Sequence, residues 1–307
     1  MAEHENGEYM ILKRNPNYAG PAPPLDAIAF REGLAPEPAV ARVDSGQADA
    51  VLMASEPLLA PTGPVANRPQ APTTSRYEAL PQLGGALLAL NAGRPLFSDV
   101  KVRRAANRAI DRAALAAIWS ETPSASLLRP GIAGYRPVPG LSLTGDDGTR
   151  AGRPRRARMG VPADCDPCRR TFEAVRTALA RIGIEVVAAR FDDEVVADLG
   201  HAELDIADGG FGIDYPDGAS LLARVAHTAL PAEWRPPGLD AEIDHLDRLT
   251  GEARAAAAAR LALRLALRDV PVITYGYDVV GALISHRLGC DDIDGELDLL
   301  KLCVGSD

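Results

Sequence analysis

The segment Gly209–Asp217, GGFGIDYPD, holds the residues with the clearest capacity for binding chemistry. Within it Asp214 stands beside Tyr215, and Phe211 precedes both. A strand expected over Leu204–Ala207 runs into this segment, which should therefore lie at a strand's carboxyl end, where α/β domains commonly bind ligands. A carboxylate partly shielded from water at such a place can hold a protonated amine through a charge-assisted hydrogen bond. Alternatively, the carboxylates of the segment only stabilise a turn.

Cys165 and Cys168 form a second candidate, a C-x-x-C pair between a strand expected at Arg158–Val161 and a helix expected at Arg169–Ile182. The pKa of a thiol falls at a helix N-terminus, and thioredoxin-like proteins place their redox pair there. A thiol-redox protein that uses this pair is one alternative function, although no other part of the chain is typical of that fold. The simpler interpretation is a structural disulfide in an oxidising compartment.

Cys290 and Cys303 are the remaining cysteines. We favour a bridge between these two near the C-terminus, so that the chain contains one or two disulfides. A zinc site would need this pair to approach Cys165 and Cys168 in space, and no close second pair in the sequence supports it. Spacing alone leaves the pairing of the four cysteines open.

The overall composition excludes several classes of protein. The chain has 307 residues, 47% of them hydrophobic, which suffices for two lobes of ordinary domain size. Its formal net charge is -9 with no long block of one sign, so nucleic acid is not an expected partner. No stretch reaches the roughly 18 apolar residues of a membrane helix. The histidines form no metal-binding pair, and no nucleophile elbow, Walker A or dinucleotide motif occurs, so we expect no catalysis, cofactor or metal.

The element that should position the candidate residues is the segment Arg94–Arg112, RPLFSDVKVRRAANRAIDR. Pro95 favours an extended start, and either Ser98 or Asp99 can cap the helix that follows. Asp111 should cap a second helix up to Trp119. Apolar residues of the first helix recur at three- and four-residue spacing and predict a face that packs on a core: Val102, Ala105, Ala106, Ala109 and Ile110. We expect its polar side chains to point elsewhere: Lys101, Arg103, Arg104, Asn107 and Arg108.

The order of the expected elements predicts an α/β protein. The strand at Arg158–Val161, the helix at Arg169–Ile182 and a strand at Ile184–Ala189 predict a parallel strand pair joined by a helix. A short helix is expected at Glu194–Leu199. Asp240 is expected to cap a further helix.

The segment Arg94–Arg112 also resembles, almost residue for residue, the pattern P-F-x-D-V-R-V-R-x-A-x-x-x-A-I-D-R of the family 5 extracytoplasmic solute-binding proteins. These are the peptide-, dipeptide- and nickel-type receptors of ABC importers. Other phrases are similar to the family as well: LKRNPNY from Leu12, GQADAV from Gly46, GGALLALN from Gly84 and LARIGIEVV from Leu179. The segment GFGIDYPD resembles the family phrase G-W-x-x-D-Y-P-D-P.

This resemblance implies a two-lobe clamshell of the type II periplasmic-binding-protein kind. The chain corresponds to the later part of a family member, so the first lobe is expected to be incomplete. The implied division is residues 1–90 for part of lobe I, 91–284 for lobe II, and 285–307 for a segment that returns to lobe I. The implied function is that of the substrate-binding component of an ABC importer, which binds peptides or similar small solutes in an interlobe cleft without catalysis.

The resemblance also implies the ligand-binding residues. By residue match, Asp214 would hold the α-ammonium group of a peptide. Phe211 stands where much of the family has Trp, and it could pack on a ligand side chain together with Tyr215. Asn91 ends the strand that is expected to act as a hinge. Gly218 replaces the last proline of the phrase, so we expect a looser turn there.

The implied partners are a small peptide or other small solute and an ABC permease in the membrane. The implied location is periplasmic or at the cell surface. The first 20 residues contain no apolar signal core and no lipobox cysteine. An alternative function is a sensor or regulatory interaction module of the same fold without a role in transport.

Overall fold

The computed structural model describes residues 3–54, 58–59, 63–68, 74–146, 155–191, 203–289 and 298–305. Its internal contacts divide the chain into unit 1, Met1–Gln82 with Val279–Asp307, and unit 2, Leu83–Asp278. Two long strands, β5 (Ser75–Leu90) and β10 (Val272–Ser285), belong partly to each unit. The sequence-based ranges instead place all of β5 in the first range and nearly all of β10 in the second, and they stay a prediction.

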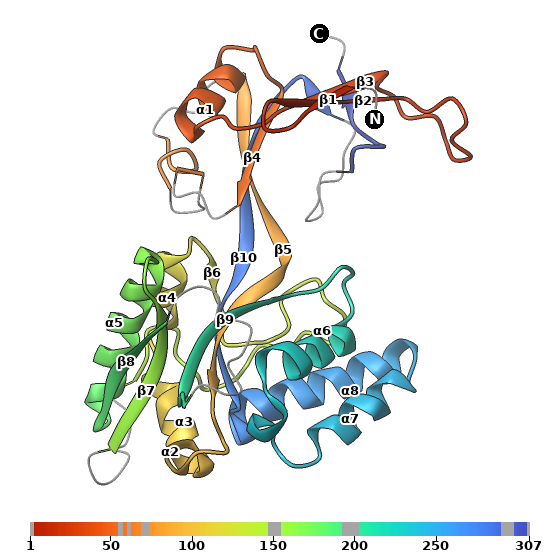
Figure 1. Cartoon of the computed structure of the whole chain (residues 1–307). Helices are drawn as coiled ribbons and strands as arrows, with labels where there is room; N and C mark the ends of the chain where they lie inside the picture. The colour runs from red at the N-terminus through yellow and green to blue at the C-terminus, as the bar shows by residue number, and fades with distance from the viewer. Residues whose placement is uncertain are drawn as a thin grey trace. The chain divides into compact units, whose positions relative to one another are not determined.

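Unit 1 contains two small sheets and part of a large one (Figure 1). Three antiparallel strands form the first sheet: β1 (Glu3–Glu5), β2 (Tyr9–Lys13) and β3 (Ala27–Arg31). After helix α1 (Pro36–Asp44), strand β4 (Ala50–Ala54) pairs antiparallel with the end of β10. The short strands β11 (Leu288–Gly289) and β12 (Cys303–Val304) pair near the C-terminus.

Unit 2 contains the strands that position the candidate site. Strand β9 (Ile206–Gly212) pairs antiparallel with β5 and parallel with β7 (Arg155–Pro162). Strand β7 in turn pairs parallel with β8 (Ile184–Phe191). A short strand, β6 (Thr122–Pro123), pairs with β10. The order in the large sheet is β4-β10-β5-β9-β7-β8, so the parallel β7–β8 pair predicted from the sequence is confirmed.

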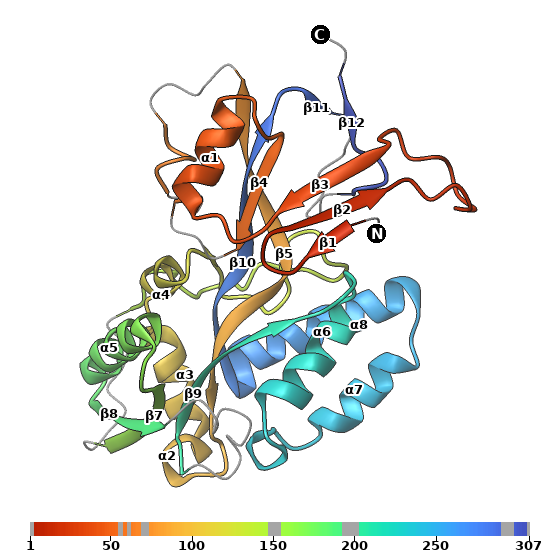
Figure 2. The ribbon, with the colours of Figure 1, turned by 45° about the horizontal axis from the view of Figure 1, so that its top comes forward.

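The helices of unit 2 cover both faces of this sheet. The α-helices are α2 (Pro95–Ser98), α3 (Val100–Ala109), α4 (Arg112–Ile118), α5 (Asp166–Arg181), α6 (Gly218–Arg224), α7 (Leu239–Asp247) and α8 (Gly251–Arg264). Short π- or 3-10-helical segments are η2 (Val225–Ala229), η3 (Ala232–Trp234) and η4 (Leu265–Asp269). Figures 1 and 2 show α5 beside β7 and β8, and α6, α7 and α8 packed together as a separate group.

Alternation along β5 explains why helices lie on both faces. Leu88 and Leu90 belong to one buried hydrophobic cluster, which includes residues of α3 and α5. Leu87 and Ala89 belong to the other cluster, which includes residues of α6, α7 and α8. Because successive residues of a strand point to opposite faces, a strand that is apolar on both faces must be covered on both.

The capping residues of α3 and α4 agree with the sequence. The Asp99 carboxylate accepts a hydrogen bond from the Lys101 amide at 2.8 Å, and the Asp111 carboxylate accepts one from the Ala114 amide at 2.9 Å. These bonds satisfy amides that the first helical turn leaves free. Of the two candidates for the first cap, Asp99 rather than Ser98 therefore fulfils the role.

The prediction that the polar side chains of α3 point away from the core is wrong for Arg103 and Asn107, which are buried. Arg103 Nε donates to the Asp269 carbonyl at 2.8 Å. Arg112, at the start of α4, is 1% exposed, and its Nε donates to the Thr274 carbonyl at 3.0 Å. These guanidinium groups donate to backbone carbonyls that lie near the end of unit 2 in the sequence. Because the carbonyls need donors, the two side chains are buried in the fold.

Other helix boundaries differ from the sequence-based ones. Helix α5 begins at Asp166, three residues before the expected Arg169, because Cys165 serves as its N-cap. Asp240 does not cap α7; the N-cap is Gly238, and Asp240 lies in the first turn, 3.1 Å from Arg235. The helix expected at Glu194–Leu199 lies outside the described residues. None of the helices in the described ranges is both long and apolar enough to cross a membrane.

Candidate functional site

The candidate site begins on β9, where the described residues leave one edge without a paired strand after the first residue. From Ile206 to Gly212 the strand pairs with β5, in a register that runs from Leu90 to Gly84. On the other side β7 pairs with β9 only at Ile206, opposite Met159. Among the described residues, the edge of β9 beyond Ile206 therefore has no strand beside it. Backbone groups on such an edge can pair with an extended ligand.

Phe211, one of the expected ligand contacts, is a core residue in unit 2. Its side chain is 8% exposed and belongs to the hydrophobic cluster under α6, α7 and α8. Gly85 lies opposite it on β5, and a Cβ there would lie 3.0 Å from the Phe211 ring and 2.6 Å from the Gly276 carbonyl oxygen. The aromatic ring thus fills space that a glycine leaves open, and it supports β9 from within the core.

Asp217 ends the turn that follows β9. Its carboxylate accepts a hydrogen bond from the Ser220 amide at 2.7 Å, as the N-cap of α6, and it lies 2.9 Å from Arg254 Nη2. The hydrogen bond from Arg254 is the main reason why the pKa of Asp217 falls to about 2. The sequence suggested a looser turn at Gly218. A Cβ there would lie 2.7 Å from the Ala133 carbonyl oxygen, so the turn is tight and this expectation is wrong.

Asp214 and Tyr215 occupy the exposed part of the same turn. Tyr215 is 58% exposed, and its hydroxyl lies 3.0 Å from the Ser220 hydroxyl. Asp214 is also exposed, and among the described residues its carboxylate has no hydrogen-bond or ion-pair partner. Of the four residues expected to bind ligand, these two present polar groups to solvent.

Asn91 follows β5 and is buried, with 6% of its surface exposed. Its amide nitrogen donates to the Leu204 carbonyl at 2.9 Å, and its amide oxygen accepts from the Gly93 amide at 3.0 Å. Both polar atoms are therefore used to fix the chain where β5 ends and β9 approaches. The structure does not bring this side chain together with Asp214.

A group of three neighbouring carboxyls was missed by the sequence reasoning: Asp208 and Glu121 are half-buried, and Asp278 is exposed. Asp208, in the middle of β9, accepts a hydrogen bond from the Tyr275 hydroxyl at 2.9 Å and one from the Gly209 amide. Burial raises the pKa of Asp208 to about 7, against the opposing effect of these two bonds. Burial, followed by the charge of Asp208, also raises the pKa of Tyr275.

Glu121, just before β6, is the second member of this group. Its pKa rises to about 8, chiefly through burial and then through the charges of Asp278 and Asp208. Its Oε2 atom is buried and has no hydrogen-bond partner among the described residues. Asp278, the last residue of unit 2, has its pKa raised by burial.

Two glycines make room for these carboxyls. A Cβ at Gly276 would overlap the Glu121 carboxylate, and a Cβ at Gly84 would overlap the Asp278 carboxylate. The only available sign of this arrangement in the sequence is polar or glycine residues inside strands that are otherwise apolar. Within the described ranges, no group of three or more His, Cys, Asp or Glu side chains is arranged to hold a metal ion.

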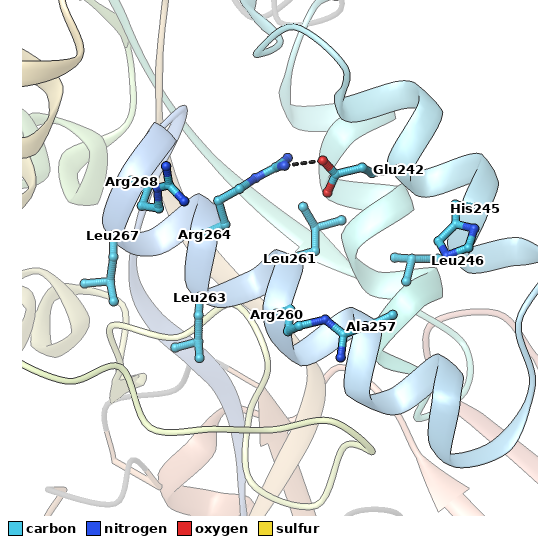
Figure 3. Close-up of a pocket in the computed structure, with 10 residues that line it drawn as sticks. All are labelled: Glu242, His245, Leu246, Ala257, Arg260, Leu261, Leu263, Arg264, Leu267 and Arg268. Carbon is cyan, nitrogen blue, oxygen red and sulfur yellow. Dashed lines mark hydrogen bonds and ion pairs between the residues drawn. The ribbon is translucent and has the colours of Figure 1, made fainter.

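A pocket of 610 Å³ lies elsewhere in unit 2, along α7, α8 and η4 (Figure 3). Leu261, Leu263 and Leu267 line it together with Arg260 and with Arg264, which pairs with Glu242. None of the four expected ligand-binding residues lies in this pocket, so it is a separate surface feature.

The sequence matches the family described as bacterial extracellular solute-binding proteins, family 5 Middle, over residues 1–230. The chain belongs to this family. The resemblance first noted in Arg94–Arg112 is thereby confirmed. Comparison with curated proteins gives no significant match.

Solved structures support the same fold. The chain is similar to HbpA2 from Haemophilus parasuis, with a TM-score of 0.79, 15% identity and 100% of this chain covered. It is similar to DppA from Helicobacter pylori, solved with the peptide STSA, with a TM-score of 0.66, 16% identity and 98% covered. It is also similar to NikA from Brucella suis, solved with Fe(III)-EDTA, with a TM-score of 0.72, 20% identity and 99% covered.

These similarities confirm the predicted α/β fold of the type II periplasmic binding proteins. The chain spans 63% of the length of HbpA2, 61% of DppA and 67% of NikA. This partial coverage agrees with the expected incomplete first lobe. At 15–20% identity the similarity concerns the fold, and the ligands of those proteins are properties of their own sites.

Proposed function

We propose that this chain is part of a solute receptor that binds peptides or similar small solutes for an ABC importer. Membership of the solute-binding family supports this proposal, and DppA, one of the similar structures, was solved with a bound peptide. The receptor would work outside the cytoplasmic membrane, in the periplasm or at the cell surface, and would deliver its solute to a permease. It would bind its solute without changing it chemically.

The observation that carries the proposal is the exposed carboxylate of Asp214, which has no partner among the described residues and follows the edge of β9 on which they place no paired strand. An extended peptide could pair its backbone with this edge, while its protonated amine meets Asp214. Tyr215 would pack on the ligand. Phe211 and Asn91 would act from inside, because one fixes β9 from the core and the other fixes the start of the strand.

A panel of di- to pentapeptides with free and acetylated N-termini tests this proposal. Calorimetry on the full chain should show that Asp214→Asn weakens binding of free-amine peptides by about 10- to 100-fold, the range expected when a charge-assisted hydrogen bond is lost. Asp244→Asn is the matched control, because Asp244 is an exposed carboxylate on α7. Equal binding of free and acetylated peptides, with no effect of Asp214→Asn, would refute the role of Asp214.

A further inference from the structure

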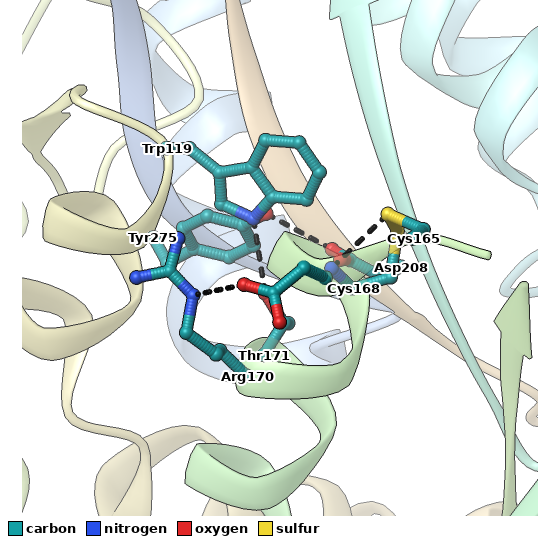
Figure 4. Close-up of a disulfide and its surroundings, with 8 residues drawn as sticks. Trp119, Cys165, Cys168, Arg170, Thr171, Asp208 and Tyr275 are labelled. Carbon is teal, nitrogen blue, oxygen red and sulfur yellow. Dashed lines mark hydrogen bonds and ion pairs between the residues drawn. A yellow bond between two sulfur atoms is a disulfide. The ribbon is translucent and has the colours of Figure 1, made fainter. Parts of the chain in front are cut away.

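The solute-binding proposal makes no use of the C-x-x-C motif. In the structure, Cys165 and Cys168 form a disulfide with a Cα–Cα distance of 5.2 Å (Figure 4). It follows the carboxyl end of β7 and closes the start of α5, where Cys165 is the N-cap and its Sγ accepts a hydrogen bond from the Cys168 amide at 3.2 Å. The bond thus joins the cap of the helix to its first turn.

The two sulfurs differ in their surroundings. Both cysteines are partly exposed. Cys168 packs against the hydrophobic cluster that contains Tyr275, whereas Cys165 is not among the residues packed against that cluster. We therefore take Cys165 as the sulfur that an external thiol attacks, and Cys168 as the sulfur that would leave toward the interior.

The N-terminus of α5 suits a thiolate. The helix has 16 residues, and its free amides and dipole favour a negative charge at the first turn. Asp166 in that turn would oppose this effect, but it pairs with Arg169 and, at 3.2 Å, with Arg170. The reduced form of the pair is therefore stabilised by its position, which makes a disulfide easier to reduce.

The carboxyl of Asp208 belongs to the surroundings of this pair. Strands β7 and β9 run parallel and pair at Met159 and Ile206, so their carboxyl ends share one edge of the sheet. The disulfide follows β7 at this edge, and Asp208 is two residues beyond Ile206 on β9. Figure 4 shows Asp208 and Tyr275 in the surroundings of the disulfide. Burial raises the pKa of Asp208 to about 7, so near neutral pH this carboxyl can give up a proton, and the other titratable groups that interact with it are Tyr275 and Glu121.

We propose that Cys165–Cys168 is a reversible dithiol–disulfide centre that exchanges with an external dithiol, with Asp208 as the proton donor to Cys168. A thiolate of the external dithiol bonds to Cys165 Sγ, the Cys165–Cys168 bond breaks, and its electron pair passes to Cys168 Sγ, which takes the proton of Asp208. The second thiolate of the external dithiol then displaces Cys165. The external dithiol is oxidised to a disulfide, and both cysteines are reduced.

This centre goes beyond solute binding and does not depend on it, because Asp214 has no part in the exchange. Reduction would break the covalent link between the N-cap of α5 and its first turn. Trp119 would report this change, because its Nε1 donates to Thr171 Oγ1 in the second turn of that helix at 3.0 Å.

The first experiment treats the native full chain with dithiothreitol, alkylates free thiols and locates them by mass spectrometry. Cys165 and Cys168 should become alkylated together without denaturant, and the fluorescence of Trp119 should change at the same rate. Cys165→Ser should abolish that change. If the two cysteines react only after the chain is unfolded in concentrated urea, the disulfide is structural and the proposal is wrong.

The second experiment measures the rate constant of reduction per dithiothreitol thiolate as a function of pH. In the native chain this constant should fall above pH 7, because the proton donor is lost. Asp208→Asn should remove the pH dependence and slow reduction below pH 7 by about an order of magnitude or more. Asp244→Asn is the control and should leave the profile unchanged, since Asp244 is an exposed carboxylate on α7.

Tyr275→Phe provides a test that keeps the carboxyl in place. The hydrogen bond from Tyr275 lowers the pKa of Asp208, so its loss should move the fall in the profile to higher pH. A structural role of Asp208 would not produce this shift. If neither Asp208→Asn nor Tyr275→Phe alters the profile while the disulfide is still reduced, Asp208 is not the proton donor.

Discussion

Replacing Glu121 with Gln should change how the stability of unit 2 depends on pH. Burial and two neighbouring carboxyls raise the pKa of Glu121 from 4.5 to about 8. In the folded chain this carboxyl keeps its proton at pH values where the unfolded chain has released it. Unfolding therefore releases a proton between about pH 5 and 8, and the free energy of unfolding falls as the pH rises through this range.

The shift sets an upper limit on the effect. At about 1.4 kcal/mol per pKa unit, a rise from 4.5 to about 8 corresponds to about 5 kcal/mol above pH 8. Rearrangement of the site and penetration of water reduce the cost of burying a charge, so we expect about 2 to 5 kcal/mol. Gln has the shape of the protonated acid and carries no charge. Glu121→Gln should therefore be close to the native chain in stability at pH 5 and more stable than it at pH 9.

Urea denaturation followed by tryptophan fluorescence measures this difference. The chain has two tryptophans, Trp119 and Trp234, and both lie in unit 2, so the signal reports on that unit alone. Glu233→Gln is the control, because Glu233 is exposed in the same unit. If Glu121→Gln shifts the stability equally at both pH values, the carboxyl does not hold a proton in the folded chain and the reasoning fails.

Three further predictions concern residues that hold unit 2 together. Arg112→Ala should lower the free energy of unfolding by about 3 to 5 kcal/mol in the same urea assay, because buried carbonyls lose their donors. Arg108 is exposed, and the control Arg108→Ala should change this free energy by less than about 0.5 kcal/mol. Asp217→Ala should cost about 1 to 3 kcal/mol at pH 7, since it removes a helix cap and the partner of Arg254. This cost should shrink as the pH falls from about 4 to 2, where the folded chain protonates the carboxyl, and a cost independent of pH would contradict it. Gly218→Ala should cost about 1 to 3 kcal/mol, because its Cβ would lie 2.7 Å from a backbone carbonyl oxygen of the facing loop, and an unchanged thermal midpoint would show that the turn has room.

Local structure was predictable where it depends on neighbours in the sequence. Asp99 and Asp111 cap the helices that follow them, since a cap needs only the amides two or three residues further on. The apolar spacing of α3 and the strand–helix–strand order around α5 are local in the same sense. The position of Asp214 in a turn after a strand also follows from short-range patterns.

Buried polar groups were not predictable, because their partners are distant in the sequence. Arg103 and Arg112 have the spacing of exposed helix residues, but carbonyls more than 160 positions away accept their hydrogen bonds. Asp208 and Glu121 likewise owe their environment to β10, which comes late in the chain. A one-dimensional pattern contains no sign of such partners.

The division of the chain into these two units was not predictable from the sequence either. Strand β5 is one continuous strand from Ser75 to Leu90, and the division after Gln82 falls inside it. Strand β10 returns through the same region in one piece, from unit 2 to unit 1 after Asp278. Pro81 and Gly84 lie close to the boundary in β5, but a single strand runs through it, so these residues do not mark a turn between two domains.

The carboxyl end of β9 places different side chains in different environments over a few residues. Because alternate side chains of a strand point to opposite faces, Phe211 packs in the core while Asp208 bonds to Tyr275. Beyond Gly212 strand pairing no longer fixes this alternation, and Asp214 is exposed. The two carboxyls therefore meet different reagents: the pKa of Asp208 suits exchange of a proton within the fold, whereas Asp214 can meet a cation from solvent. Asp208→Asn and Asp214→Asn should consequently separate thiol exchange from solute binding, since each removes the group that one process needs and keeps the group that the other needs.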